Sequence, residues 1–443
     1  MARHFTLPRY TARVKKVPYM SRATYRRDLL SWTLLAVALG GVEGGITGVI
    51  VKNAFAGAVA PLTLNFAVAA VTGASALSHV LSWVWAGASQ GRDKIRLLIT
   101  IQVLTCVSLL LIAAAPIDSM GLALVIAGAV LARFFWSGVT TIRSSVWRAN
   151  YPREMLATMS GRLVTVGALL MGIVGIVVGV AMDWDARAFR WVYPVLAAVG
   201  IAGALAYRRM RMRQQKRLLV MERDNRRAEG NLINPLRLLR LLKGDDRFRE
   251  YMSLMFVFGS GNLMLMAPLI VILNDHMQLS TLQQMMVTSS IPLLTMPLAI
   301  PAWARLLDTR HVIHYRAKQS WAGTAMIAAV LLAVVTRTEW LLWVSAVLYG
   351  VSQAGGMLGW NIGHHDFAPP ERATQYMSVH MTLTGIRGIM MPLAGVALYE
   401  LVEFASPGHG PWMMLAPLAL NLAACVGFVR ASRRLRATEG QHA

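Results

Sequence analysis

Three ionisable residues lie within stretches of the sequence that are otherwise apolar enough for a membrane interior. Glu43 sits in the run GGVEGG (Gly40–Gly45), and Arg133 and Arg387 interrupt two later apolar runs. A charged side chain at the bilayer centre costs on the order of 3 kcal/mol on insertion scales, so such residues face a bundle interior or a wet cavity and are usually functional. We therefore expect Glu43 to carry a coupling proton or to bind a cation. The structural alternative is an ion pair with Arg133 at a similar depth.

The two buried arginines outnumber this single acid. Arg387 lies too deep in its apolar run for its guanidinium to reach either surface easily. An unpaired guanidinium is then left, which an anionic ligand could bind in bidentate fashion. In the alternative interpretation, one arginine bonds to backbone carbonyls or to neutral side chains. The polar residues expected to bind a substrate are Arg133, Arg387, Asn65, Asn262, Gln353 and Asn361.

Histidines and an acid gather in the segment WNIGHHDFAPPERATQYMSVH. His364, His365 and Asp366 come where one apolar run ends, and His380 lies near the start of the next. Adjacent residues of a helix project about 100° apart, so His364 and His365 lack the spacing of a helical metal site. We expect no metal there and interpret the segment as a polar helix end. A gating or proton-relay role stays open because histidine titrates near neutral pH.

The composition indicates a polytopic membrane protein. The chain has 443 residues, of which 56% are hydrophobic and only 15% charged, whereas a soluble protein carries about 25% charged residues. The net charge is +23, but most of the basic residues lie in segments between apolar runs. No folded basic domain therefore remains to bind nucleic acid. Cys106 and Cys425 both lie inside apolar runs and form no disulfide or metal pattern.

A transmembrane helix needs about 20 mostly apolar residues, and this rule predicts an all-α fold of twelve spans. Six spans precede the basic segment Tyr207–Glu250, which has 14 Lys or Arg in 44 residues, and six follow it. A segment this charged is expected to be a solvated connector. The predicted spans are 29–52, 61–87, 95–115, 120–142, 158–181, 190–207, 251–273, 283–306, 316–336, 340–362, 375–400 and 411–430.

The positive charge of the short loops predicts the orientation. With the N-terminus inside, the inner segments collect 38 of the 44 Lys and Arg, and the outer loops collect only four. We therefore expect both termini in the cytoplasm, an inner (plasma) membrane location, and binding of anionic lipids at the basic loops. The expected parts are a basic arm (1–28), a first bundle (29–207), a linker (208–250), a second bundle (251–430) and a tail (431–443).

The two predicted bundles match each other at a constant offset of 217 residues. Asp28 aligns with Asp245, and the Gly40–Gly45 run aligns with VFGSGN. The triplet Pro152-Arg153-Glu154 aligns with Pro369-Pro370-Glu371. An unchanging offset in several loops favours a parallel internal repeat. Paired repeats with the substrate site between them are a known plan for secondary transporters.

Two loops and one helix give the chain a resemblance to the major facilitator superfamily. That family carries G-x-x-x-D-R-x-G-R-R between its second and third helices; here GASQGRDKIR (Gly87–Arg96) stands there, and the repeat copy is ARLLDTR (Ala304–Arg310). The fourth span contains RFFWSG from Arg133, similar to the family's intramembrane arginine motif. The resemblance implies that these loops lock the cytoplasmic face. The residues expected to act in gating are Arg92, Asp308, Arg310, His364, His365, Asp366 and His380.

These features predict a secondary transporter that moves a small molecule by alternating access and is coupled to a proton or another ion. The favoured substrate is an organic anion or zwitterion, because Arg133 and Arg387 oppose Glu43 alone. One alternative is a multidrug/proton antiporter, although the fifth span lacks the Gly-Pro pair common in that class. Another is a membrane sensor or scaffold of the same fold. We find no catalytic motif, and we expect no enzyme activity, no cofactor and a monomer.

Overall fold

The computed structural model describes residues 19–228, 242–368 and 373–441. Every regular element assigned within these ranges is a helix. Ten helices of the described chain are long and apolar enough to cross a membrane, and a shorter apolar stretch covers Pro61–Ala76. The fold is therefore an all-helical, polytopic membrane fold, as the hydropathy of the sequence predicts.

The helices divide into a first half, a connecting helix and a second half. The first half holds α1 (Tyr19–Gly40), α2 (Ile46–Ala54), α3 (Pro61–Val80), α4 (Ser82–Ser89), α5 (Lys94–Ala113), α6 (Ser119–Asn150), α7 (Arg153–Trp184) and α8 (Phe189–Tyr207). The connecting helix is α9 (Gln215–Ala228). The second half holds α11 (Asp246–Asp275), α12 (Thr281–Met285), the π-helix η1 (Met286–Ser290), α13 (Ile291–Asp308), α14 (Val312–Thr336), α15 (Glu339–Ile362), η2 (Gly363–Asp366), α16 (Ala373–Ala405), η4 (Gly410–Met414) and α17 (Leu415–Gln441).

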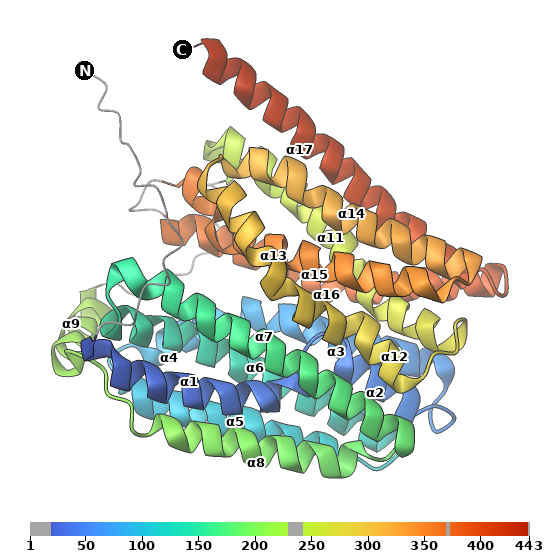
Figure 1. Ribbon diagram of the computed structural model, residues 1–443, viewed down its shortest axis with the longest axis horizontal. Coiled ribbons are helices and arrows are strands. Elements are labelled where there is room, and N and C mark those ends of the chain that lie inside the picture. The colour runs from blue at the N-terminus through green and yellow to red at the C-terminus, as the bar shows by residue number, and fades with distance from the viewer. Residues whose placement is uncertain (1–18, 229–241, 369–372, 442–443) are drawn as a thin grey trace.

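The two halves lie side by side and pack on each other (Figure 1). The start of α1, α9 and the end of α17 lie at one end of the molecule, which we call the linker end, and α2 and α12 lie toward the opposite, far end. Between the halves, α3 packs against α16, and α7 packs against α12, η1 and α13. The largest apolar core belongs mainly to the first half and includes Ile270 and Met285 of the second.

Three predicted spans are interrupted. The span 29–52 breaks between Gly40 and Ile46, and the span 61–87 breaks at Leu81. The span 283–306 is built from α12, η1 and α13, and its π-helix ends just before Pro292. Proline has no N–H to continue the regular bonding pattern of an α-helix, and glycine has a low helix propensity. Helix α1 begins at Tyr19, within the predicted basic arm 1–28.

The same tryptophan contact occurs in both halves. The indole Nε1 of Trp85 donates to Phe134 O at 3.0 Å, and that of Trp303 donates to Val351 O at 2.9 Å. Gly138 lies against the Trp85 ring, and Gly355, which is 217 residues later, lies against the Trp303 ring. A Cβ at Gly138 would lie 2.7 Å from the Trp85 ring, and a Cβ at Gly355 would lie 3.1 Å from the Trp303 ring and 2.6 Å from Gln319 Cγ, so both places favour glycine. This shared packing supports the internal repeat inferred from the sequence.

At the linker end, the first half is held together by a buried ion pair. Arg143 donates to Asp28 Oδ1, and the two side chains are 1% and 0% exposed. Trp147 Nε1 and Tyr151 OH donate to the other carboxylate oxygen at 2.7 and 2.9 Å. Burial, and then the charge of Asp28, raise the pKa of Tyr151 above its ordinary value, so its hydroxyl remains a donor. Asp28, the last residue of the predicted basic arm, is thus a buried structural residue.

We expect Asp28→Asn to lower the melting temperature of the detergent-solubilised protein strongly, because removing one partner of a buried ion pair costs about 3–5 kcal/mol. The matched control is Asp246→Asn, whose pair with Arg249 is exposed on both sides at 83% and 51%. Such pairs contribute about 0–1 kcal/mol. Equal shifts for the two variants, measured by thermal unfolding, would show that the buried pair has no special role.

Candidate functional site

The break between α1 and α2 places Glu43 in a turn and not in a helix. Gly44 has φ +58°, a left-handed conformation that favours glycine, and a Cβ there would lie 2.5 Å from Ser289 Oγ of the second half. The unwound backbone is nevertheless bonded, since Tyr193 OH donates to Gly41 O at 2.6 Å. Unwound segments inside membrane helices occur where the backbone is buried in protein or lines a site.

Arg133 from α6 joins the carboxylate of Glu43 to the broken backbone. Its Nη1 lies 2.7 Å from Glu43 Oε2, and its Nη2 donates to Val42 O. Arg133 has 9% of its side chain exposed, whereas Glu43 has 31%. The guanidinium is therefore enclosed, and the carboxylate keeps one side open.

The second half contacts this turn through its π-helix. Gly45 N donates to Ser289 Oγ at 2.8 Å, and Ser289 Oγ lies 3.5 Å from Glu43 O. On α15, Gln353 Nε2 donates to Tyr349 OH at 3.0 Å, and that phenol lies within electrostatic range of Glu43. Elements of both halves therefore meet around Glu43, and π-helical turns are frequent at functional sites.

The other predicted substrate residues lie at separate places. Arg387 is only 5% exposed and donates to Met255 O and to Thr384 Oγ1 within the second half. Asn361 is exposed and donates to Met357 O on its own helix at 2.9 Å. Asn262 is half-buried, and its Oδ1 has no hydrogen-bond partner among the described residues. The structure therefore brings Arg133 to Glu43 and keeps Arg387 apart from that pair.

The predicted gating residues are not joined to one another. Arg92, Asp308 and Arg310 are exposed, and none of them forms an ion pair with another described residue. Asp366 instead accepts from Val312 N at 2.6 Å, beside the exposed His365.

The two remaining histidines of that set are buried. His364 and His380 are 4% and 0% exposed. Burial, and then its neighbour His365, lower the pKa of His364 to about 4, so it is neutral near pH 7.

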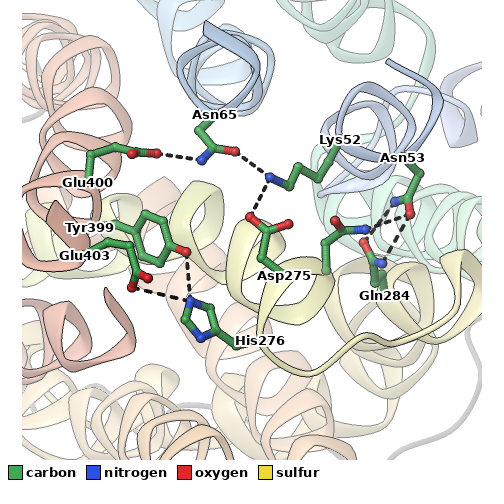
Figure 2. A network of polar contacts seen from close by, with 10 residues as sticks. Lys52, Asn53, Asn65, Asp275, His276, Gln284, Tyr399, Glu400 and Glu403 are labelled. Atoms are coloured by element: carbon green, nitrogen blue, oxygen red, sulfur yellow. Dashed lines mark hydrogen bonds and ion pairs between the residues drawn. The ribbon is translucent and has the colours of Figure 1, made fainter. Parts of the chain in front are cut away.

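A polar network at the far end joins the halves (Figure 2). Lys52, only 4% exposed, places its Nζ 2.7 Å from Asp275 Oδ2 and 2.7 Å from Asn65 Oδ1. Asn65 Nδ2 donates to Glu400 Oε1 at 2.6 Å. The network thus links α2 and α3 of the first half to α11 and α16 of the second.

Further pairs extend this network. Asn53 Nδ2 donates to Gln284 Oε1 at 3.1 Å and Asn53 Oδ1 accepts from Asn274 at 2.9 Å. His276 contacts Tyr399 OH at 2.9 Å and lies 3.7 Å from Glu403 Oε2 (Figure 2). Among the residues that the structure describes, Lys52–Asp275 is the ion pair that bridges the halves.

Lys52 is one of the four basic residues that the predicted orientation places in the outer loops, and Asn65 was predicted to bind the substrate; neither was expected in a network between the halves. The available signal was the separation of charge between the halves. Lys52 lies in the last turn of α2, whereas Asp275 ends α11 and Glu400 and Glu403 lie near the end of α16. Opposite charges at the same end of two repeats are able to pair across the interface.

Two helical halves that meet at a half-buried acid and are joined at one end match the plan of a secondary transporter. The family model of the Major Facilitator Superfamily matches residues 29–392. The chain belongs to the Major Facilitator Superfamily and is a membrane transporter, not an enzyme. No curated protein sequence matches the chain.

Solved structures share this fold. A mutant of the nucleoside transporter NupG superposes with a TM-score of 0.67 at 11% identity, covering 92% of this chain and 98% of that one. The D-xylose-proton symporter gives 0.67 at 8% identity, with 92% and 96% covered. A POT family transporter in complex with 5-aminolevulinic acid gives 0.62 at 12% identity, with 94% and 97% covered.

We expect Lys52→Gln to loosen the far end, because the variant removes the cation that joins Asp275 to Asn65. The measurement is the distance between spin labels at Ala58→Cys and Ser406→Cys, with Cys106 and Cys425 replaced by Ala. Lys52→Gln should broaden this distribution and add longer distances. The control is Arg337→Gln, which removes an exposed cation of the same end. Identical distributions in the two variants would show that the network does not hold the halves together.

Proposed function

We propose that this transporter couples the movement of protons to that of an organic anion or zwitterion through Glu43. The observation that carries the proposal is the Glu43–Arg133 pair of 2.7 Å, set in an unwound turn that both halves contact. The carboxylate is partly exposed, so a proton can reach it, and its partner is enclosed. A proton bound here changes the charge at the contact between the halves.

The pair supplies a simple rule for coupling. While Glu43 is ionised, it occupies Arg133. When Glu43 binds a proton, the ion pair is lost and the guanidinium becomes available to a carboxylate or phosphate of the substrate in bidentate geometry. Coulomb energies are several-fold larger in a low-dielectric site than in water, so Arg133 strongly favours an anion once Glu43 is neutral. Proton and substrate then bind together, which is symport.

The second arginine has a smaller part in this proposal than in the sequence-based hypothesis. Arg387 is bonded to Met255 O and Thr384 Oγ1 inside the second half. Its exposed fraction of 5% leaves little surface for a substrate between the halves. Arg133 alone is therefore assigned the substrate's acidic group, with Tyr349 and Gln353 as polar residues on the opposite side. The solved complex with 5-aminolevulinic acid, a zwitterion, shows that this fold can hold such a compound.

A second candidate is an exporter of hydrophobic compounds coupled to protons. The observation that favours it is the same pairing: Arg133 is neutralised by Glu43, and Arg387 braces α11 against α16. In this candidate the pair stays closed during binding, and the substrate contacts apolar side chains. The two candidates differ in whether Arg133 meets the ligand.

We also propose that the linker end faces the cytoplasm of a cell with this protein in its inner membrane. Lys and Arg concentrate there, as the positive-inside tendency requires. Four arginines line one depression at this end and are suited to the phosphates of anionic lipids; they are Arg27, Arg208, Arg209 and Arg211. With the far end joined by the polar network, the described conformation is then the one that opens toward the cytoplasm.

We expect Glu43→Gln to abolish uptake driven by a pH gradient while leaving exchange of substrate for substrate intact. Glutamine resembles the protonated acid, so Arg133 stays available and binding of acidic ligands no longer weakens as the pH rises. The measurements are flux in proteoliposomes and the ligand-induced rise in melting temperature. The rise reports binding because a ligand increases the free energy of unfolding by RT ln(1 + [L]/Kd). Glu339→Gln, at an exposed acid of the far end, is the control.

Unchanged gradient dependence in Glu43→Gln would contradict the coupling role of this acid. If acidic ligands stabilise neither the parent nor Glu43→Gln, while hydrophobic cations stabilise the parent, the exporter candidate is correct and the anion proposal is wrong.

The orientation has its own test. Reporter fusions after Ala115 or Met182 should report the outside, and a fusion after Gln215 should report the cytoplasm, because the basic segments remain inside. The opposite pattern would reverse the proposed orientation without affecting the proposed coupling.

A further inference from the structure

The second half contains a group of buried basic side chains that transport by Glu43 and Arg133 does not use. Arg316 of α14 and Arg387 and His380 of α16 are 1%, 5% and 0% exposed. Contacts of α15 connect them. The Trp360 ring lies against His380, and Trp360 Nε1 donates to Thr384 Oγ1, which also accepts from Arg387. Gly359, next to Trp360, packs on Arg316. We call these three residues the basic cluster.

The hydrogen bonds of both arginines go to neutral acceptors. Arg316 Nη1 donates to Gln319 Oε1 at 2.6 Å, and its Nη2 donates to Gly356 O at 3.3 Å. Arg387 donates to Met255 O and, at 3.1 Å, to Thr384 Oγ1. No described acid forms an ion pair with either guanidinium. Asp366 and Arg316 both lie within electrostatic range of Tyr251. The Asp366 carboxylate is exposed, however, and accepts a hydrogen bond from Val312 N.

Several polar atoms of the cluster have no hydrogen-bond partner among the described residues. The Nε atoms of Arg316 and Arg387 and both ring nitrogens of His380 are buried and make no hydrogen bond with the described residues. Burying a charged group without a counter-charge is strongly unfavourable, and buried polar atoms are normally bonded. An anion at this place would satisfy both the charge and the donors.

The fold itself does not require basic residues here. One repeat earlier, at the offset of 217, the equivalent positions are Ile99, Leu163 and Leu170. The first half thus builds the same layer with apolar side chains. In the second half, glycines make room for the guanidiniums: a Cβ at Gly359 would lie 2.8 Å from Arg316 Cζ, and Gly259 packs on Arg387. The second half therefore makes room for two buried cations, although the first half has apolar residues at the equivalent positions.

We propose that the basic cluster is a binding site for a small inorganic monoanion of the chloride type. The backbone of α11 closely approaches the guanidinium of Arg387 and that of α15 approaches the guanidinium of Arg316, which favours a small spherical ion over a large one. Its ligands are the free Nε–H groups of Arg316 and Arg387 and an N–H of His380. The site lies inside the second half, so the anion stabilises this half in place and is not the transported substrate.

Bromide serves as the probe, because it replaces chloride and quenches tryptophan fluorescence. Trp360 lies against the cluster, with its ring centroid 5.4 Å from that of His380. We expect sodium bromide or chloride, exchanged for gluconate at constant ionic strength, to raise the melting temperature of the full-length protein in a saturable manner. Bromide should also quench a saturable part of the fluorescence, and Trp360→Phe should lose that part.

Variants identify the ligands. Arg387→Gln should remove both saturable effects, and Arg305→Gln, at an exposed arginine of α13, should keep them. Arg316→Lys retains the charge and should retain binding with a weaker apparent affinity. If Arg387→Gln does not fold, the titrations of the parent and of Trp360→Phe still decide the question.

Three results would overturn the proposal. Equal melting temperatures in chloride and gluconate would show that no such anion binds. Stabilisation by phosphate but not by chloride would assign the cluster to oxyanions. Competition between bromide and a transported substrate would make the cluster part of the transport site. Glu43→Gln should leave bromide binding unchanged, so failure of the coupling proposal and failure of this one are distinguishable.

Discussion

The structure depends on how the unwound turn at Gly40–Gly45 satisfies its backbone in a low-dielectric interior. In lipid, each unbonded N–H or C=O is costly, and irregular backbone survives only where protein groups replace the missing bonds. Tyr193, Arg133 and Ser289 supply them here. Arg133 must therefore reach the turn for a structural reason, and Glu43 must lie beside it to balance its charge. The contact with Ser289 then ties the turn to the second half.

The two repeats share a packing scheme but handle buried charge differently. In the first half, Arg143 pairs with Asp28 and Arg133 pairs with Glu43. In the second half, Arg316 and Arg387 have only neutral acceptors among the described residues. The repeat thus fixes where helices approach one another, and the charges are particular to each half. An asymmetry of this kind places the acid proposed for coupling in one half and two buried guanidiniums, paired with no described acid, in the other.

Much of this arrangement could be predicted from the sequence. Hydropathy is a property of long segments, so the spans and the basic break were predictable. The similar depth of Glu43 and Arg133 allowed their ion pair, which was the structural alternative to a functional acid. The unwound turn was less accessible, because its stability comes from Tyr193 and Ser289, which are remote in sequence. The far-end network was missed because a helix-end lysine and a helix-end acid look solvated until the halves are placed together. The partners of Arg387 were not predictable either. The direction in which its side chain leaves α16 decides that it bonds to Thr384 inside the second half and not to a substrate between the halves.

The far-end network has a strength suited to a reversible switch. Moving a two-state equilibrium from 1:99 to 99:1 needs about 5.5 kcal/mol. A hydrogen bond between protein groups contributes about 1 kcal/mol net, and bonds to charged groups contribute about 1.5–3 kcal/mol. Lys52 bonds to Asp275 and Asn65, Asn65 bonds to Glu400, and further bonds connect Asn53 to its neighbours. Because Asp275 keeps 37% of its side chain exposed, water can replace its partner when the halves separate. A network of this size is strong enough to favour one state, and under the proposed coupling a change of charge at Glu43 together with substrate binding releases it.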